Sequence, residues 1–208
     1  MIIKCIPVGP LATNCYIFGC SETLEASIID PGLTRPEQAG LLRNLAASNL
    51  KAKYIINTHG HPDHVSLNAE LKEATGAEIL IHEWDAHLLE KPWNIIAEYG
   101  EIEPVKPDRL LRDQDIIMIG RLELQVIHTP GHTRGSISLH CREGNVVFTG
   151  DTLFYGSVGR TDLPGGSPRD LESSLKNRLM RLPDNTVVYP GHGPKTTIGR
   201  ERRLNPFL

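Results

Sequence analysis

Hydrophobic positions along the 208-residue chain follow two periods, and the second half repeats the order of elements of the first. Short apolar runs bounded by Gly, Pro or Asn predict strands, and apolar residues spaced three or four apart predict helices. The first half predicts strands at 2–8, 15–19, 25–30, 54–56 and 78–81, and helices at 36–47, 65–74 and 83–89. Prolines and glycines interrupt the pattern between 92 and 108, which indicates an irregular excursion.

The second half shows the same alternation of strand and helix patterns. Gly120 and residues 143–145 predict hairpin turns between neighbouring strands. Strands are predicted at 115–119, 122–128, 136–141, 146–149 and 186–189, and helices at 168–179 and 198–204. The repeated order favours two mixed sheets packed face to face with helices outside. No low-complexity linker separates the halves, so we expect a single domain over residues 1–208.

Composition narrows the possible partners. The net charge of −3 and the 5% aromatic content give no reason to expect nucleic acid or a membrane surface. Lys4, Pro7 and Pro10 interrupt the N-terminal apolar run, so it does not resemble a signal peptide. The four cysteines lack the CxxC spacing of a structural zinc site, and we expect reduced thiols in a cytoplasmic protein.

Residues 58–64 read Thr-His-Gly-His-Pro-Asp-His, directly after a predicted strand. In an extended segment, residues two apart point to the same side, so His59 and His61 can reach one ion together. Pro62 favours a turn into a helix, where the adjacent side chains of Asp63 and His64 point towards a second position. The spacing therefore fits two neighbouring metal ions better than one.

Other candidate ligands each follow an apolar strand and stand beside a glycine. These candidates are His132, Asp151 and His192. Active-site residues often gather on loops at strand ends, and imidazole and carboxylate ligands suit zinc, iron or manganese. The absence of thiolate from the set indicates an open catalytic site rather than a closed structural one. Residues without a companion at ligand spacing are interpreted as ordinary polar residues, namely His82, His87 and His140.

The chain's motifs resemble those of the metallo-β-lactamase superfamily. The resemblance rests on His-x-His-x-Asp-His at 59–64, Thr-Pro-Gly-His-Thr around His132, Thr-Gly-Asp-Thr around Asp151 and Pro-Gly-His-Gly around His192. It covers essentially the whole chain and implies an α/β fold, a four-layer αββα sandwich. Asp30 matches the first aspartate of the family, which supports a ligand imidazole from behind.

Within this superfamily, residues 149–154, 156–162 and 196–208 are similar to small single-domain bacterial members of the glyoxalase II-like branch. The resemblance implies two divalent metal ions, with zinc as the first expectation and iron or manganese as alternatives. By the family pattern, the first ion is held by His59, His61 and His132, the second by Asp63, His64 and His192, and Asp151 bridges them.

The activity implied by this resemblance is hydrolysis of a thioester such as S-lactoylglutathione by attack of a metal-bound hydroxide. Asp63 would orient the nucleophile and take up its proton. Longer glyoxalase II enzymes carry a C-terminal helical domain that binds glutathione, which we do not expect here. They also carry Lys and Tyr where this chain has Arg160, Thr161 and Asp162, the candidates for substrate contact.

Two other functions stay open from the sequence. Gly-Arg-Thr-Asp at 159–162 also occurs in persulfide dioxygenases, which are relatives with one iron, so such a dioxygenase is the main alternative. A metal-binding module without catalysis is the other, although the ligand set has no gap. The expected partner is a small molecule, and the oligomeric state is left undetermined.

Overall fold

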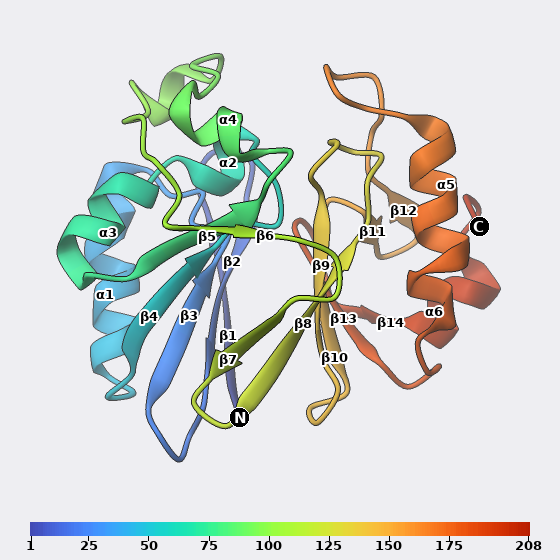
Figure 1. Cartoon of the computed structure of the whole chain (residues 1–208), viewed down its shortest axis with the longest axis horizontal. Coiled ribbons are helices and arrows are strands. Elements are labelled where there is room, and N and C mark those ends of the chain that lie inside the picture. Colours follow the sequence, from blue (N-terminus) through green and yellow to red (C-terminus); the bar gives the residue numbers. More distant parts are fainter.

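The computed structural model describes residues 1–208 and shows two six-stranded sheets enclosed by helices (Figure 1). The first sheet has the strand order β1-β2-β3-β4-β5-β6, antiparallel from β1 to β3 and parallel from β3 to β6. Its strands are β1 (Ile2–Val8), β2 (Thr13–Gly19), β3 (Glu25–Ile29), β4 (Lys51–Ile56), β5 (Glu78–His82) and β6 (Arg109–Leu111).

The second sheet has the order β14-β13-β10-β9-β8-β7, in which only the β10–β13 pair is parallel. Its strands are β7 (Ile116–Ile119), β8 (Leu122–His128), β9 (Ile137–Cys141), β10 (Val146–Gly150), β13 (Val187–Pro190) and β14 (Thr196–Thr197). A separate two-stranded ribbon pairs β11 (Leu153–Phe154) with β12 (Ser157–Val158).

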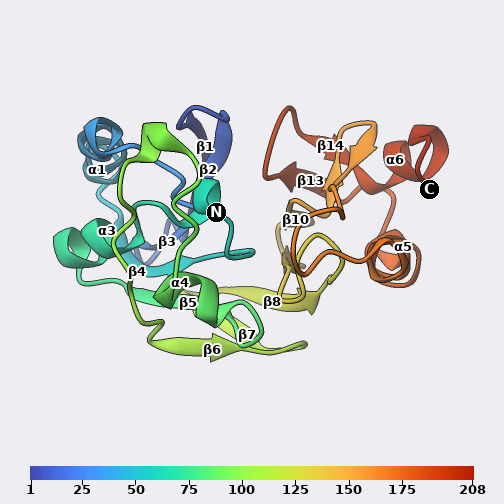
Figure 2. The same ribbon diagram turned by 90° about the horizontal axis from the view of Figure 1, so that it is seen from above.

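Helices cover the outer faces of the two sheets, as Figure 2 shows from above. The first-half helices are α1 (Gln38–Ala46), α2 (Pro62–Val65), α3 (Asn68–Thr75) and α4 (Ala86–Glu90), and the second-half helices are α5 (Pro168–Asn177) and α6 (Ile198–Leu204). Single 3₁₀ turns occupy Arg35–Glu37, Ala97–Tyr99 and Leu179–Arg181. The longest helix has ten residues, and none has the length and hydropathy needed to cross a membrane.

Alternation along the strands divides the apolar core into three layers. Ile28 and Ile55 face α1 and α3, whereas the next residues along the same strands, Ile29 and Ile56, pack between the sheets. In the second sheet, Phe148 faces the first sheet and Val147 lies under α5 and α6. Successive side chains of a strand point to opposite faces, so buried neighbours require a layer on each side. The predicted αββα sandwich is confirmed.

The structure corrects the predicted helix at 65–74. α2 ends at Val65 and α3 begins at Asn68, because the two residues between them donate hydrogen bonds to a neighbouring loop. The Leu67 N–H donates to the Pro31 carbonyl at 3.3 Å, and the Ser66 hydroxyl donates to the Leu33 carbonyl at 2.8 Å. The short strands β6, β11, β12 and β14, of two or three residues each, were also absent from the prediction.

Several strands end at the same edge of the sandwich. Asp30 follows β3, the segment 57–64 follows β4, Asp151 follows β10 and His192 comes just after β13. In open sheets, the carboxyl ends of parallel strands form a crevice in which ligands bind. The topology therefore gathers residues from both halves of the chain at one edge.

Candidate metal centre

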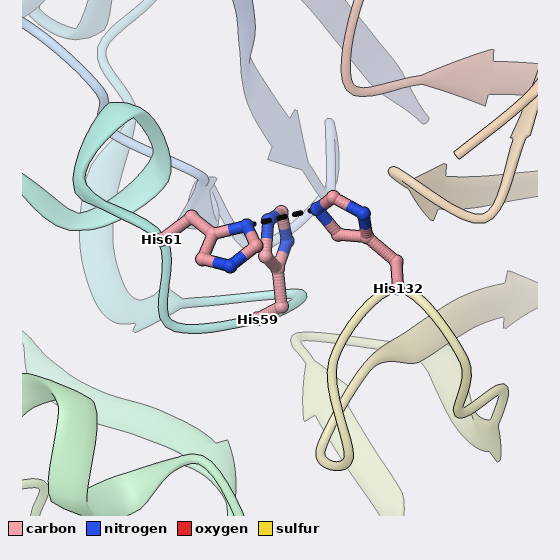
Figure 3. Close-up of side chains that lie close together, drawn as sticks. All are labelled: His59, His61 and His132. Atoms are coloured by element: carbon pink, nitrogen blue, oxygen red, sulfur yellow. Dashed lines mark hydrogen bonds between the residues drawn. The ribbon is translucent and has the colours of Figure 1, made fainter. Parts of the chain in front are cut away.

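All seven predicted ligands lie together at this edge. The nitrogens of His59, His61 and His132 form one group of potential ligand atoms within 4.8 Å of one another, and Figure 3 shows their rings converging. Asp63, His64 and His192 form a second group, and His59, His64 and Asp151 a third, by the same measure. The first two groups correspond to the two positions expected from the sequence.

Asp151 stands between the two groups. Its Oδ2 lies 3.6 Å from Nε2 of His132 and 3.6 Å from Nε2 of His192. Its Oδ1 lies 3.4 Å from Nε2 of His64. One carboxylate therefore faces ligands of both groups, which is the position that a bridging ligand requires.

Backbone carbonyls determine which ring nitrogen of two histidines is free. Nδ1 of His132 lies 2.8 Å from the Arg160 carbonyl, and Nδ1 of His192 lies 3.2 Å from the Leu11 carbonyl. A carbonyl only accepts, so Nδ1 carries a proton in both rings, and Nε2 is the ring nitrogen that faces Asp151. His61 donates from Nδ1 to the free Nε2 of His132 at 2.8 Å (Figure 3).

Asp30 supports the site from behind. It accepts from the Thr58 N–H at 2.7 Å and from the Thr58 hydroxyl at 2.6 Å, and its Oδ2 lies 3.0 Å from Nδ1 of His64. Because the Thr58 hydroxyl donates to Asp30, it accepts from Nδ1 of His59 at 3.2 Å. Asp30 itself has a φ of +53°, a strained conformation for a non-glycine residue that is typical of functional sites.

The protonation states of His59, His61 and Asp63 suit the binding of a cation. Burial, together with neighbouring imidazoles, lowers the pKa of His61 to about 3 and moves the pKa of His59 well below its usual value. Burial alone would raise the pKa of Asp63, but nearby imidazoles, His64 first, hold it well below the usual range. At neutral pH these histidines are neutral bases beside ionised carboxylate, as metal binding demands.

Unpartnered ligand atoms show that the residues fit metal ions. Nε2 of His59, Nε2 of His64 and Oδ1 of Asp151 are buried and have no hydrogen-bond partner. Buried polar atoms are almost always paired, so a cluster of unpartnered atoms fits a site that binds metal ions. The donor set of imidazoles and carboxylates suits divalent transition metals, as expected from the sequence.

The three predicted substrate-contact residues, Arg160, Thr161 and Asp162, differ in exposure and in their partners. The Arg160 guanidinium forms a bidentate pair with Asp162, with both nitrogen–oxygen distances at 2.7 Å, and both side chains are exposed. Thr161 between them is partly buried. The structure thus assigns Arg160 a definite contact through its carbonyl, on His132, while its contact with substrate stays a prediction.

Three residues near the ligands escaped the sequence reasoning. Asp85, at the start of α4, accepts hydrogen bonds from the Gly60 N–H and the Gly135 N–H. These two glycines lie in the loops that carry the ligands of the first group. The Thr13 hydroxyl donates to Asp63 at 3.3 Å, and the Trp93 ring packs on His61 with a centroid distance of 5.3 Å. None of the three belongs to a motif with ligand spacing, so only the fold reveals them.

Fold and site together define a metal-binding αββα protein, and comparisons with known proteins agree. A family model described as the metallo-beta-lactamase superfamily matches residues 8–192. Hydroxyacylglutathione hydrolase GloC of Haemophilus influenzae is 38% identical, with 100% of this chain and 98% of that protein covered.

Two solved structures are similar over nearly their whole length. The BLEG-1 B3 metallo-beta-lactamase superposes with a TM-score of 0.92 at 36% identity, covering 100% of this chain and 99% of the other. TTHA1623 in a di-iron-bound form superposes with a TM-score of 0.87 at 40% identity, covering 99% and 100%. The chain belongs to the metallo-β-lactamase superfamily, a superfamily of metal-dependent hydrolases.

Proposed function

We propose that this protein is a metallo-hydrolase that cleaves a thioester, with two divalent metal ions, zinc first among them. The observation that carries the proposal is the position of Asp151, whose one carboxylate faces His132 of the first group and His64 and His192 of the second. Two bound cations of this kind would lower the pKa of a water between them and polarise a carbonyl.

The chain's own residues supply orientation and a proton acceptor. Asp63 is 8% exposed, and its Oδ2 lies 3.2 Å from Nε2 of His192 and 3.3 Å from the Thr13 hydroxyl. Such a fixed, ionised carboxylate can orient a water and accept its proton. In the overall reaction, the water oxygen forms a bond to the acyl carbon, the carbon–sulfur bond breaks, and the thiolate leaves with the electron pair.

The choice of a thioester is supported by the similarity to hydroxyacylglutathione hydrolase GloC. The main alternative, an oxygen-dependent persulfide dioxygenase with one iron, is favoured by one feature. The stretch 159–162, which occurs in those relatives, lies directly against His132 through the Arg160 carbonyl. Because BLEG-1 is named a β-lactamase, a β-lactam serves as a third test substrate.

The test compares metal-loaded protein with two carboxamide variants, using S-lactoylglutathione, a chromogenic β-lactam and glutathione persulfide. Asp63→Asn should lower kcat for the thioester by about a hundredfold or more, the usual contribution of a general base. Asp108→Asn, at a carboxylate far from the cluster that accepts from Lys72 and the Ile79 N–H, should leave kcat unchanged. Equal losses in both variants would remove Asp63 from its proposed role.

The results with the other substrates would distinguish the thioesterase from the two alternative functions. Oxygen uptake on the persulfide by protein with one iron per chain would replace the thioesterase with the dioxygenase. Turnover of none of the three substrates by metal-loaded protein would leave a metal-binding module.

A further inference from the structure

A groove leads away from the first ligand group between α4 and the loops around 130–134 and 164–165. It consists of an inner cavity of about 400 Å³ and an outer cavity of about 770 Å³, which share His87, Arg134 and Gly165. The inner cavity is lined by Trp93, whose ring packs on His61, and by Thr133, which follows His132. The inner end of the groove therefore adjoins the candidate metal centre.

The inner cavity carries positive charge without a protein partner. Lys91 and Arg134 both line it, both are exposed, and neither side chain takes part in an ion pair or hydrogen bond. The one carboxylate in its wall, Asp85, already accepts from the Gly60 N–H, the Thr133 hydroxyl and the Gly135 N–H. Two unpaired cations beside a saturated carboxylate favour an anionic ligand.

The outer cavity presents a flat aromatic surface. Trp84 is 54% exposed and stands edge-on to His128, with a centroid distance of 5.0 Å and an interplanar angle of 83°. His128 is itself stacked on His82 at 4.3 Å with an angle of 3°. An exposed indole held in place by two rings is a platform on which a planar group can stack.

We propose that this groove binds the thiol arm of the substrate, and that the arm is anionic, with its charged group between Lys91 and Arg134. The inference rests on the proposed thioester hydrolysis, because it places the leaving thiol of that reaction. The shared chemistry is an acyl-carrying thiol with carboxylate or phosphate. A nucleotide-bearing thiol would also reach Trp84, whereas a peptide thiol would occupy the inner cavity alone.

The test uses thioesters that share one acyl group and differ in the thiol. N-acetylcysteamine supplies a neutral arm, glutathione a carboxylate arm, and coenzyme A an arm with phosphates and a planar base. Lys91→Ala and Arg134→Ala should each raise KM for the charged thioesters about tenfold, the loss expected for a charge-assisted hydrogen bond, with kcat unchanged. KM for the neutral thioester should not change. Arg142→Ala is the matched control, since Arg142 is exposed and lines a different cavity.

The Trp84→Ala variant shows whether the anionic thiol carries a nucleotide or a peptide. A rise in KM for the coenzyme A thioester alone assigns the groove to a nucleotide-bearing thiol, and no rise with any thioester assigns it to a peptide thiol. Equal changes in KM for neutral and charged thioesters in the two cation variants, or no change in either, would overturn the proposal.

Calorimetry with the free thiols separates this inference from the proposed function. Suppose that no thioester is cleaved, but that charged thiols bind and Arg134→Ala weakens their binding about tenfold. The groove is then supported as an anion-binding site, and the proposed thioesterase activity is refuted. If the wild-type protein cleaves thioesters and binds charged and neutral thiols equally, the thioesterase stands and the anion site falls.

Discussion

Replacing Asp85 by Asn should loosen the contact between the two loops that carry the first ligand group. Asp85 is 2% exposed and accepts from Gly60 N–H at 3.0 Å, the Thr133 hydroxyl at 2.7 Å and Gly135 N–H at 2.8 Å. Gly60 lies between His59 and His61, and Thr133 follows His132. One carboxylate thus joins ligand loops from opposite halves of the chain.

The magnitude follows from the donors that Asn cannot satisfy. An amide has one oxygen, so its NH₂ group faces either the Gly60 N–H or the Gly135 N–H, whichever way it is turned. A buried donor without an acceptor costs about 1–3 kcal/mol. Metal binding would then have to hold the loops together unaided, so we expect affinity at the first group to fall about tenfold to a hundredfold.

A competition titration with a chromogenic chelator measures this loss, alongside urea unfolding of the metal-free protein. Asp108→Asn is the control, because Asp108 also accepts from a backbone N–H, that of Ile79, but lies far from the ligands. We expect both variants to be less stable and only Asp85→Asn to bind one ion more weakly. Two ions bound as tightly as in the wild type would refute the positioning role of Asp85.

Further predictions concern pH and the shape of the site. Burial, with stacked His128 adding to it, lowers the pKa of His82 from 6.5 to about 4, and its Nδ1 accepts from the Trp84 N–H. As pH falls from about 6.5 to 4, His82 takes up its proton more readily in the unfolded chain than in the folded one. The free energy of unfolding of the metal-free wild type should therefore fall by up to about 3 kcal/mol more than that of His82→Gln. Urea unfolding at pH 7 and 4.5 measures the difference, and identical pH dependence in both proteins would contradict it. In Gly191→Ala, the added Cβ would lie 2.2 Å from Oδ1 of Asp151 and 2.9 Å from Cε1 of His64. Metal titration should show at least about tenfold weaker binding there, whereas Gly40→Ala, whose Cβ meets nothing closer than 3.9 Å, should bind normally.

The strand pattern allowed the layered fold to be predicted because burial on both faces leaves continuous apolar runs such as those ending at Ile29 and Ile56. The ligands could be selected because chemistry and position coincided. His59, His61, His132, Asp151 and His192 stand beside a glycine after a predicted strand, and Asp63 and His64 follow Pro62 at a predicted turn into a helix. The structure places all seven within one cluster.

What the sequence could not reveal depends on contacts between distant segments. Asp85 follows a strand without any spacing signal, and its importance appears only when loops 60 and 133–135 meet it. Trp93 lies in a stretch without periodicity, yet its ring covers His61. The break after Val65 likewise arises from hydrogen bonds to residues 31–33, which local helix propensity does not contain.

The most direct test of the account is a titration of chelator-treated protein with zinc, in which bound metal and hydrolysis of S-lactoylglutathione are followed together. If the two ligand groups form one centre around Asp151, the metal-free protein should be inactive and hydrolysis should reach its maximum at two ions per chain. Full hydrolysis by the metal-free protein, or no hydrolysis at two bound ions, would contradict it.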